Sequence, residues 1–299
     1  MKNVLKSCTL CPRECKVDRT IGQTGLCGMT SKIKVARIAP HYYEEPPISG
    51  ESGSGAIFFS GCNLKCIFCQ NYNISTNNFG KEISINKLAQ KMIELQNKKV
   101  HNINLVTPTH YIPQIREAIK QAKKMGLTIP IIYNTSSYEK VESLKMLDGL
   151  IDVYLPDLKY FDDFLAIRYS KAPNYFNTAI DAIEEMYRQT GPVVLDENGL
   201  IKKGLIVRHL MLPNQIEDSK KILEYLHLIY NDNIFISIMN QYTPLEQVKN
   251  IDELNRPITK KEYDDLIDYA YDLGIHNAFV QEEETCKESF IPDFDLTGV

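Results

Sequence analysis

What the sequence lacks already excludes several classes of protein. No run of about 20 apolar residues occurs, which argues against a helical membrane span. The N-terminal stretch MKNVLKSCTLCPREC has no apolar segment long enough for a signal peptide. Positive charge is not in excess either, because the formal net charge is -4 and the isoelectric point is about 5.9. The chain therefore has no broad basic surface that would attract nucleic acid. We therefore predict a cytoplasmic protein that binds neither membranes nor nucleic acid.

Low-complexity tracts are also missing, and the composition is that of an ordinary globular protein. Hydrophobic residues make up 43% of the 299 residues, and charged residues make up 24%. We expect the chain to fold throughout and to bury a large core. Length alone does not decide between a single α/β barrel and two domains.

The eight cysteines are distributed unevenly. Seven of them lie within the first 69 residues, and only Cys286 stands apart. A reducing cytosol disfavours structural disulfides and favours metal-binding or redox roles for clustered thiols. The clustered cysteines therefore indicate functional sites, whereas we interpret Cys286 as a passive thiol.

From residue 56 onward, short apolar runs alternate with longer amphipathic ones. Strand–helix units in series predict parallel strands with right-handed crossovers, in a doubly wound sheet or in a closed or partial barrel. In all of these, functional side chains gather at the carboxyl ends of the strands. The predicted strands are 56–60, 102–107, 129–135, 152–159, 205–212 and 233–239. The predicted helices are 83–98, 112–126, 137–147, 174–191, 219–231 and 259–274.

Two segments stand outside this alternation. Residues 192–204, with Asn198-Gly199 at their centre, predict a β-hairpin inserted before the fifth strand. Residues 1–50 are rich in cysteine, proline and glycine, and we expect them to form an extension on the N-terminal side of the barrel. Residues 51–299 then form the core domain and a C-terminal tail.

Three cysteines follow the first predicted strand directly, with the spacing C-x3-C-x2-C. Cys62, Cys66 and Cys69 lie in one short loop, SGCNLKCIFCQN. Three thiolates can hold a [4Fe–4S] cube through three of its irons and leave the fourth iron open to another ligand, which makes that position reactive. The alternative is a zinc site completed by a distant His or Cys, in a protein without enzymatic activity.

The spacing, together with Phe68 before the last cysteine, resembles the cluster motif of the radical S-adenosylmethionine (SAM) superfamily. Within that superfamily the chain is most similar to the pyruvate formate-lyase activating enzymes and their PflX-type relatives. The resemblance implies an α/β fold, a partial (β/α)6 TIM-like barrel with the [4Fe–4S] cluster and SAM at its open mouth. It extends over nearly the whole chain, through CxxCPRxC, EEPPISG, GSGAIFFSGCNLKCIFCQN, LVTPTHY, YNTSSYE, YLPDLKY, GLIVRHLMLP and NQYTP.

The same resemblance implies an oxidoreductase with particular partners. An electron from a flavodoxin- or ferredoxin-type donor cleaves SAM to methionine and a 5′-deoxyadenosyl radical, which abstracts hydrogen from a substrate. In an activating enzyme that substrate is a backbone glycine of a glycyl-radical protein, and a small molecule or another peptide is the alternative. The activating enzymes usually carry a basic residue shortly before the motif, where this chain has Gly55-Ala56-Ile57. The substrate therefore stays open.

The resemblance also assigns SAM-binding roles to polar residues at the strand ends. Arg208, in IVRHLMLP, matches an arginine that contacts the SAM carboxylate, a pairing that the planar guanidinium favours. Asp157 and Lys159, in YLPDLKY, match a D-x-K element whose two residues lie on the same side of a strand. For each of them the alternative is a polar group that a neighbouring loop satisfies.

Two further elements depart from the family pattern. Asn134 and Thr135 stand where the family has a D-T-N-G-like element, which together with Asp157 would form a monovalent-cation site near SAM. Asn134 replaces the acid of that element. Gln241, in NQYTP, takes the place of a histidine near SAM.

The G-G-E element that binds the SAM amino group in many members is absent. Its position is occupied by LVTPTHY, in which Thr107, Thr109 or His110 is the candidate replacement. A buried histidine with a structural hydrogen bond is an equally good interpretation of His110.

Four cysteines in the first 27 residues form a second set. Cys8, Cys11, Cys15 and Cys27 are accompanied by glycines that permit tight turns. Four thiolates make a closed site, which suits structural zinc or an auxiliary iron–sulfur cluster. The alternative is a reduced set without metal.

Overall fold

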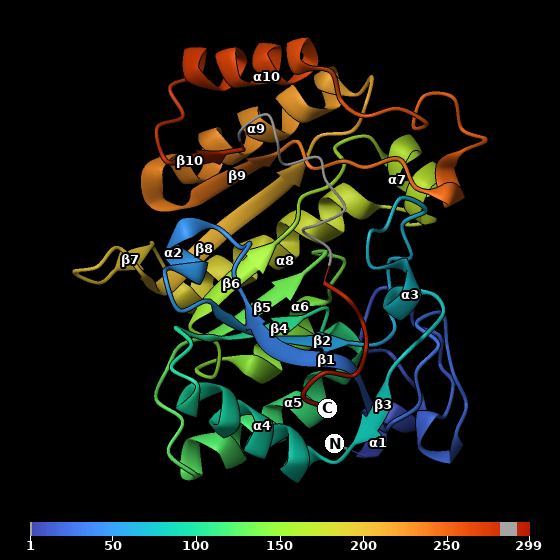
Figure 1. Cartoon of the computed structure of the whole chain (residues 1–299). Helices are drawn as coiled ribbons and strands as arrows, with labels where there is room; N and C mark the ends of the chain where they lie inside the picture. Colours follow the sequence, from blue (N-terminus) through green and yellow to red (C-terminus); the bar gives the residue numbers. More distant parts are fainter. Residues whose placement is uncertain (1, 282–291) are drawn as a thin grey trace.

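The structure is a computed structural model that describes residues 2–281 and 292–299. Its centre is a curved, mostly parallel sheet, to which the described residues contribute ten strands (Figure 1). The strand order is β10-β9-β8-β6-β5-β4-β2-β1-β3, and β7 pairs with β8 only. The strands are β1 (Ile33–His41), β2 (Ser54–Phe59), β3 (Lys81–Ile83), β4 (Ile103–Val106), β5 (Ile131–Thr135), β6 (Val153–Pro156), β7 (Val194–Leu195), β8 (Ile201–Leu210), β9 (Phe235–Met239) and β10 (Ala278–Val280).

The longer helices cover the convex face of this sheet, as right-handed β–α–β crossovers require (Figure 1). Each buries an apolar stripe; in α5 the stripe includes Ile115, Ala118 and Ala122. Ser84 and Thr259 cap α4 and α10 with their side-chain oxygens. The helices are α1 (Lys2–Lys6), α2 (Pro46–Ser49), α3 (Tyr72–Ser75), α4 (Ile85–Asn97), α5 (Ile112–Lys124), α6 (Val141–Leu144), α7 (Asp163–Ser170), α8 (Tyr175–Thr190), α9 (Ile216–Tyr230) and α10 (Lys260–Asp272), with short 3-10 helices at Arg19–Ile21, Thr109–Tyr111, Lys145–Leu147, Asn231–Asn233 and Glu246–Val248.

The concave face of the sheet has a small core of its own. Ile132, Leu155 and Ile206, from three neighbouring strands, form a buried cluster separate from the main core under the helices. Ile48 of α2 belongs to this cluster and is fully buried, and its carbonyl accepts a hydrogen bond from Asn102 Nδ2 at 2.8 Å. The helix α2 therefore fills the barrel near the amino ends of the strands.

Polar residues follow on the same face at the carboxyl ends. Side chains repeat every two residues along a strand, so Asn134, Asp157 and Arg208 lie on the face of the concave cluster, two positions beyond its members. Asp157 is bridged to Arg208, and Arg208 pairs in register with Ser237 of β9. The fold thus places one row of polar groups above an apolar plug.

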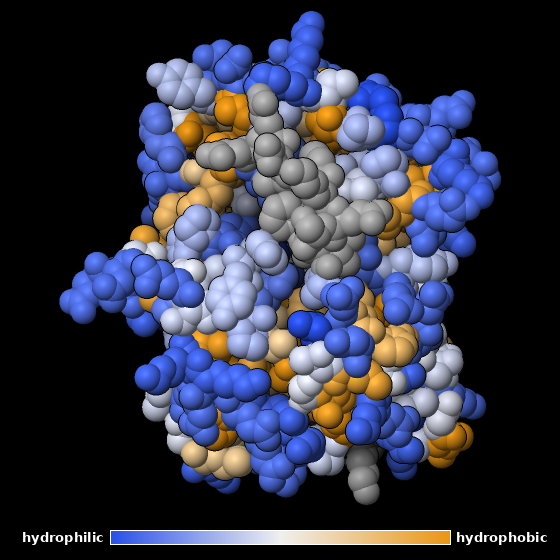
Figure 2. Space-filling model, viewed as in Figure 1, coloured by the Kyte–Doolittle hydropathy of each residue, from blue (hydrophilic) through white to orange (hydrophobic). Residues whose placement is uncertain are grey.

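The predicted architecture is confirmed: the six predicted parallel strands are β2, β4, β5, β6, β8 and β9. The predicted helix 137–147 is shorter, because Ser137 has a φ of 63° and the α-helix begins only at Val141. Helix α7 was not predicted. The predicted hairpin is present as β7 paired antiparallel to the start of β8, and its tip protrudes as a hydrophilic arm (Figure 2).

The position predicted for the N-terminal extension is wrong. Strand β1 joins the sheet antiparallel to β2, and the cysteine-rich segment before it contacts the loops at the carboxyl ends of the strands. Ser143 Oγ donates to the carbonyl of Leu10 at 2.7 Å, and Arg19 Nη1 donates to the carbonyl of His110 at 2.7 Å. The physical reason is that this segment has only a small core of its own, so it packs against those loops and exchanges hydrogen bonds with them.

Candidate active site

A cavity of about 340 Å³ opens at the carboxyl ends of the parallel strands. The loops of a partial barrel converge there, above the apolar plug formed by α2. The cavity brings together the C-x3-C-x2-C loop and most of the strand-end residues singled out above. It is lined by Cys62, Cys66, Cys69, Thr107, Asn134, Thr135, Asp157, Lys159, Arg208 and Gln241, with Glu44, Glu45, Lys65 and Phe68 among the others.

The cysteine loop begins with a glycine that no other residue can easily replace. Gly61 has a φ of 84°, and a Cβ there would lie 2.4 Å from Met29 Cγ and 2.7 Å from the Cys27 carbonyl. Lys65 also has a positive φ, of 63°, so the chain turns twice within the loop. These turns direct the cysteines toward the same cavity, and they tie the loop to the N-terminal extension.

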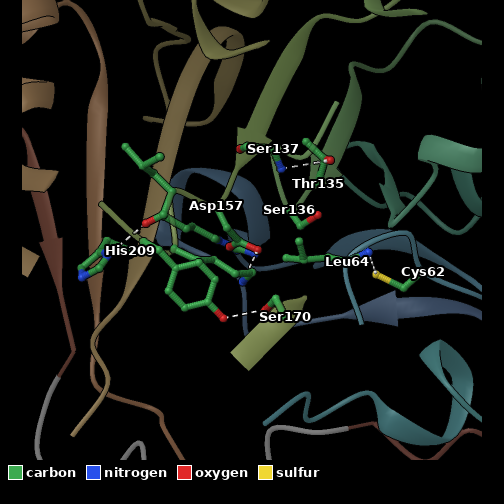
Figure 3. Close-up of polar contacts among 12 residues, drawn as sticks. Cys62, Leu64, Thr135, Ser136, Ser137, Asp157, Ser170 and His209 are labelled. Atoms are coloured by element: carbon green, nitrogen blue, oxygen red, sulfur yellow. Dashed lines mark hydrogen bonds and ion pairs between the residues drawn. The ribbon is translucent and has the colours of Figure 1, made fainter. Parts of the chain in front are cut away.

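Hydrogen bonds reach the sulfur atoms of this loop. The backbone N–H of Leu64 donates to Cys62 Sγ at 3.3 Å (Figure 3), and Ser75 Oγ donates to Cys69 Sγ at 3.4 Å. Burial raises the pKa of Cys66 to about 12 and also raises the pKa of Cys69. A bound metal would have to displace these protons, as metals do when they bind cysteine.

No group of three or more His, Cys, Asp or Glu side chains within residues 2–281 and 292–299 is arranged to hold a metal ion as it stands. The fit of an iron–sulfur cluster therefore depends on the donor chemistry of the thiols and on the cavity that they share. Soft thiolates are the donors that iron–sulfur clusters select.

The floor of the loop is aromatic. Phe68 is 5% exposed and contacts Tyr160 and Tyr242 edge to face, at ring distances of 6.4 and 6.0 Å. The hydroxyl of Tyr160 exchanges a hydrogen bond of 2.7 Å with Ser170 (Figure 3). This packing keeps water away from one side of the thiols.

The D-x-K element forms an ion pair inside the cavity. Lys159 Nζ lies 2.7 Å from Asp157 Oδ2. Burial lowers the pKa of Lys159, but Asp157 and the thiols of Cys66 and Cys69 outweigh it, so the net shift is upward. Lys159 is therefore a cation beside the cysteine loop.

Arg208 is held by two carboxylates that sequence reasoning had not connected with it. Its Nε donates to Glu45 Oε1 at 2.8 Å, and its Nη2 donates to Glu45 Oε2 at 2.5 Å and to Glu44 Oε2. Asn104 Nδ2 holds the other oxygen of Glu44 at 2.7 Å. Among the described residues, Arg208 Nη1 has no hydrogen-bond partner, and Arg208 lines the cavity. One edge of the guanidinium is thus fixed and the other edge is available to a ligand.

The charges of this group are strongly coupled. Burial raises the pKa of Glu45, but Arg208 and a hydrogen bond from Ser237 outweigh it and lower the pKa overall. Burial lowers the pKa of Arg208, and Glu44 and Glu45 raise it well above its usual value. Glu45 and Arg208 are therefore both charged at neutral pH.

Asn134, Thr135 and Gln241 also line the cavity. Thr135 Oγ1 donates to Glu139 Oε1 at 2.6 Å, and the carbonyl of Gln241 accepts a hydrogen bond from Gln70 at 2.7 Å. The latter contact links the loop of the last strand to the cysteine loop.

His110 does not line this cavity. It is 2% exposed, its Nε2 lies 2.7 Å from the carbonyl of Ser60, and burial lowers its pKa to about 3. Thr109 is buried as well and donates to Glu139 at 2.6 Å. Of the three candidates for the missing G-G-E element, only Thr107 borders the cavity.

Glu139 is a buried carboxyl that sequence reasoning missed. Thr109 and Thr135 donate to its Oε1 at 2.6 Å each, and Tyr133 donates at 3.1 Å, whereas Oε2 is buried without a partner among the described residues. Burial raises its pKa to about 7, against the lowering effect of these hydrogen bonds. In the sequence it looks like an exposed glutamate in the first turn of a helix.

The loop that carries the D-x-K element is fixed from behind by a histidine. His209 Nδ1 lies 2.8 Å from the carbonyl of Leu158, between Asp157 and Lys159 (Figure 3). Its Nε2 lies 2.8 Å from Ser219 Oγ. Burial lowers its pKa to about 4, so it is neutral. It holds the backbone of the ion pair in place.

The second cysteine set lies apart from this cavity. Cys8, Cys11, Cys15 and Cys27 line a pocket of about 10 Å³ together with Arg19 and other residues. Burial raises the pKa of Cys11 to about 12 and raises the pKa of Cys27. The structure thus brings all four predicted thiols to one small pocket. Cys286 lies outside the described residues.

No helix among the described residues combines the length and the apolar character needed to cross a membrane.

Similarity to known proteins agrees with this geometry. The chain is 30% identical over 290 residues to "Uncharacterized protein MJ0674" of Methanocaldococcus jannaschii, covering 92% of this chain and 78% of that one. Its fold is similar to that of HydG, a maturase of the [FeFe]-hydrogenase, with a TM-score of 0.53, 13% identity and coverage of 77% of this chain and 52% of that one. It is also similar to Streptococcus suis SuiB bound to precursor peptide SuiA, with a TM-score of 0.51, 14% identity and coverage of 75% and 47%.

The chain spans about half the length of these two structures. The family model for the Radical SAM superfamily matches residues 56–226. This range includes the cysteine loop, most of β2, and the parallel strands β4, β5, β6 and β8. Members of this superfamily use a [4Fe–4S] cluster and SAM. This chain belongs to the radical SAM superfamily of enzymes.

Proposed function

We propose that this protein is a radical SAM oxidoreductase similar to the pyruvate formate-lyase activating enzymes and PflX-type proteins. The observation that supports it most is the loop that presents Cys62, Cys66 and Cys69 to one cavity, beside a row of charged strand ends. Membership of an enzyme superfamily favours this proposal over a non-enzymatic zinc protein. Residues 51–299 are its catalytic core, and residues 1–50 are an extension that carries a second metal site.

The three cysteines hold the [4Fe–4S] cluster in this proposal. Hydrogen bonds from Leu64 and Ser75 reach the sulfur atoms, and such bonds tune the potential of clusters. When bound, the cluster and SAM together supply a 5′-deoxyadenosyl radical by reductive cleavage, and this radical takes a hydrogen atom from the substrate. The aromatic floor around Phe68 excludes water from this side of the site.

Charged residues of the chain orient SAM. Arg208 offers its Nη1 edge to the SAM carboxylate, while Glu45 fixes the opposite edge in a bidentate contact. Glu44 also accepts a hydrogen bond from Arg208 Nη2 and so would help to hold the guanidinium in this orientation. The ion pair of Asp157 and Lys159 presents a polar wall next to the cysteine loop.

Polar groups at the remaining strand ends complete the SAM site. Thr107 borders the cavity where the G-G-E element is absent, and Gln241 borders it on the other side. Asn134 and Thr135, with Asp157, provide oxygen atoms for a monovalent cation. His110 has a structural role in this proposal, because it lies outside the cavity.

The substrate that we propose is a glycine residue of a glycyl-radical protein. Tyr43 is 60% exposed, lines the cavity and lies next to Tyr42, which is 55% exposed, and exposed tyrosines are typical of surfaces that bind polypeptides. A small molecule or another peptide is the second candidate; the similar SuiB structure contains a precursor peptide. A flavodoxin- or ferredoxin-type protein is the proposed electron donor, and the proposed location is the cytoplasm.

Anaerobic reconstitution tests the reaction. We expect a broad absorbance at about 400 nm that dithionite bleaches, and the formation of 5′-deoxyadenosine when SAM is added. A colourless protein that contains zinc and leaves SAM intact would refute the proposal. Incubation with candidate substrates that carry deuterium then identifies the substrate, because the label appears in 5′-deoxyadenosine only when hydrogen is taken from it.

A further inference from the structure

We propose that Cys8, Cys11, Cys15 and Cys27 bind one zinc-like ion as four thiolates, that Arg19 is the counter-charge of this site, and that the ion-held extension braces the cysteine loop of the active site. The ion site lies apart from the radical chemistry, so each of the two can fail without the other, whereas the brace rests on the proposed cluster in the active-site loop.

Short turns bring the four cysteines to one place. The backbone N–H of Cys8 donates to Val17 at 3.0 Å and Lys16 donates back to Cys8 at 2.9 Å, so the chain reverses between the first and third cysteines. Gly25 approaches the third one, since a Cβ there would lie 2.6 Å from Cys15 Sγ. The segment therefore folds back on itself, as it must if four of its cysteines are to bind the same ion.

The charge of Arg19 calls for an anion in this pocket. Its side chain is 1% exposed, and its donors reach the carbonyls of Met29 at 3.0 Å, His110 at 2.7 Å and Thr30 at 2.7 Å. Within residues 2–281 and 292–299 no carboxylate lies within ion-pair distance of it. A buried cation without a counter-charge is costly.

The thiols supply the missing charge when they bind an ion. Arg19 Nη1 lies 3.8 Å from Cys8 Sγ and lines the same pocket as all four cysteines. Four thiolates on a divalent ion carry a net charge of about -2, which a buried guanidinium stabilises. His110, which lines the pocket too, remains neutral and offers no such charge.

The size of the pocket favours a single ion. A volume of about 10 Å³ is close to that of one water-sized probe, which suits an ion with four sulfur atoms at about 2.3 Å and leaves no room for a four-iron cube. As described, the thiols do not yet converge on one point, so we expect binding to draw the turns together.

The extension also needs such a ligand for its stability. Its own apolar cluster consists of Leu5, Cys8 and Leu10, with Val4 and Val17 packed against it. So small a core rarely orders a chain without a metal or a disulfide. An ion held by four residues of this segment would replace the missing core.

The same segment braces the active-site loop. Arg13, between the second and third cysteines, donates to the carbonyls of Asn63 at 2.9 Å and Leu64 at 3.2 Å, and also to that of Ser170 at 3.0 Å. Asn63 and Leu64 lie between Cys62 and Cys66. Closing the N-terminal site therefore fixes the backbone from which two active-site thiols project.

Metal analysis of a variant without the active-site thiols tests the inference. The full-length Cys62→Ala/Cys66→Ala/Cys69→Ala variant, purified anaerobically, should contain about one zinc per chain and no iron, because its N-terminal cysteines are intact. Adding Cys11→Ser and Cys15→Ser should remove this zinc, whereas adding Cys286→Ser, the matched control, should not. The first measurement needs no change in the extension, so it does not depend on the folding of the other variants.

Two results would overturn the inference. The triple variant would contain no stoichiometric metal, or it would contain about four irons per chain, which would assign a cluster to these cysteines. For the brace, we expect Arg13→Ala to lose reconstituted iron several-fold faster to a chelator than wild type, with zinc content unchanged; an equal rate would refute that part. Failure of the proposed reaction gives a different pattern, with zinc present and SAM uncleaved in the wild-type protein.

Discussion

The two cysteine sites of this molecule differ in the number of thiols and in the volume of the cavity around them. At the mouth of the barrel, three thiols share a cavity of about 340 Å³ with charged strand ends, whereas in the extension four thiols line about 10 Å³. A site that must bind a second molecule needs an open ligand position and space around it. A site that only holds the chain together needs neither, and it gains from being closed.

The buried arginines near the two sites differ in the same way. Arg208 has two carboxylate partners, Glu44 and Glu45, and keeps one edge available toward the cavity. Arg19 donates mostly to backbone carbonyls and approaches a thiol. The first arrangement presents a cation to a ligand, and the second places a cation where an anionic metal site fits.

The largest effect should come from removing the thiols of the open site. In the Cys62→Ala/Cys66→Ala/Cys69→Ala variant we expect no SAM cleavage and a far-ultraviolet circular dichroism spectrum like that of wild type, because the strands and helices do not depend on this loop. Chromatographic assay of 5′-deoxyadenosine provides the measurement. Residual product above the blank would show that another site generates the radical.

A smaller effect should follow when the arginine of the open site is removed. Arg208→Ala should weaken SAM binding by about 100-fold, or about 3 kcal/mol, because the charged contact from Nη1 to the SAM carboxylate is lost. Glu45→Gln should weaken it by about 10-fold, because the guanidinium is less well fixed. Calorimetric titration of the reconstituted protein measures both, with Arg188→Ala on the exposed surface as control. Equal affinities in all four proteins would remove Arg208 from the SAM site.

The buried carboxyl of Glu139 should affect stability as a function of pH. The folded pKa of Glu139 is raised from 4.5 to about 7, so the folded state binds this proton more tightly than the unfolded state does. Its stabilising effect is therefore complete below pH 4.5 and is lost as the pH rises to 7. Glu139→Gln should match wild type at pH 4 and exceed it by about 3 kcal/mol at pH 8. Urea unfolding curves that differ by the same amount at both pH values would contradict this.

The smallest effect should come from the residue where the two sites touch. Gly61→Ala should lower the free energy of unfolding by about 2 kcal/mol, because it adds a clash with Met29 and Cys27 to an unfavourable φ. Gly126→Ala is the matched control: its φ is 98° and no atom lies within 4 Å of the added Cβ, so it should cost about 1 kcal/mol. Equal losses of unfolding free energy in the two variants would mean that Met29 and Cys27 move aside for the added methyl group at little cost.

The sequence predicted what short-range patterns determine. The barrel strands follow from apolar runs, and the open site follows from cysteines that are close together in the chain. The same spacing rule found the four N-terminal cysteines but placed their segment on the wrong side, because which loops satisfy Leu10 or Arg19 depends on contacts with distant residues.

Contacts between residues far apart in the sequence were not predictable for a related reason. Glu45 and Arg208 are 163 residues apart. Nothing in the sequence around either residue indicates that the other is its partner. Glu139 gives no signal either, because the hydroxyl groups of Thr109, Tyr133 and Thr135 that bond to it come together only in the fold.

The stretch from Glu44 to Ile48 determines two properties of the reaction chamber at once. Its carboxylates set the charge of one wall through Arg208, and Ile48 sets the depth at which the barrel is closed. Since Ile48 touches neither the cysteine loop nor Arg208, exchanging this one residue among relatives offers a way to change the depth of the chamber while the carboxylates that hold Arg208 stay in place.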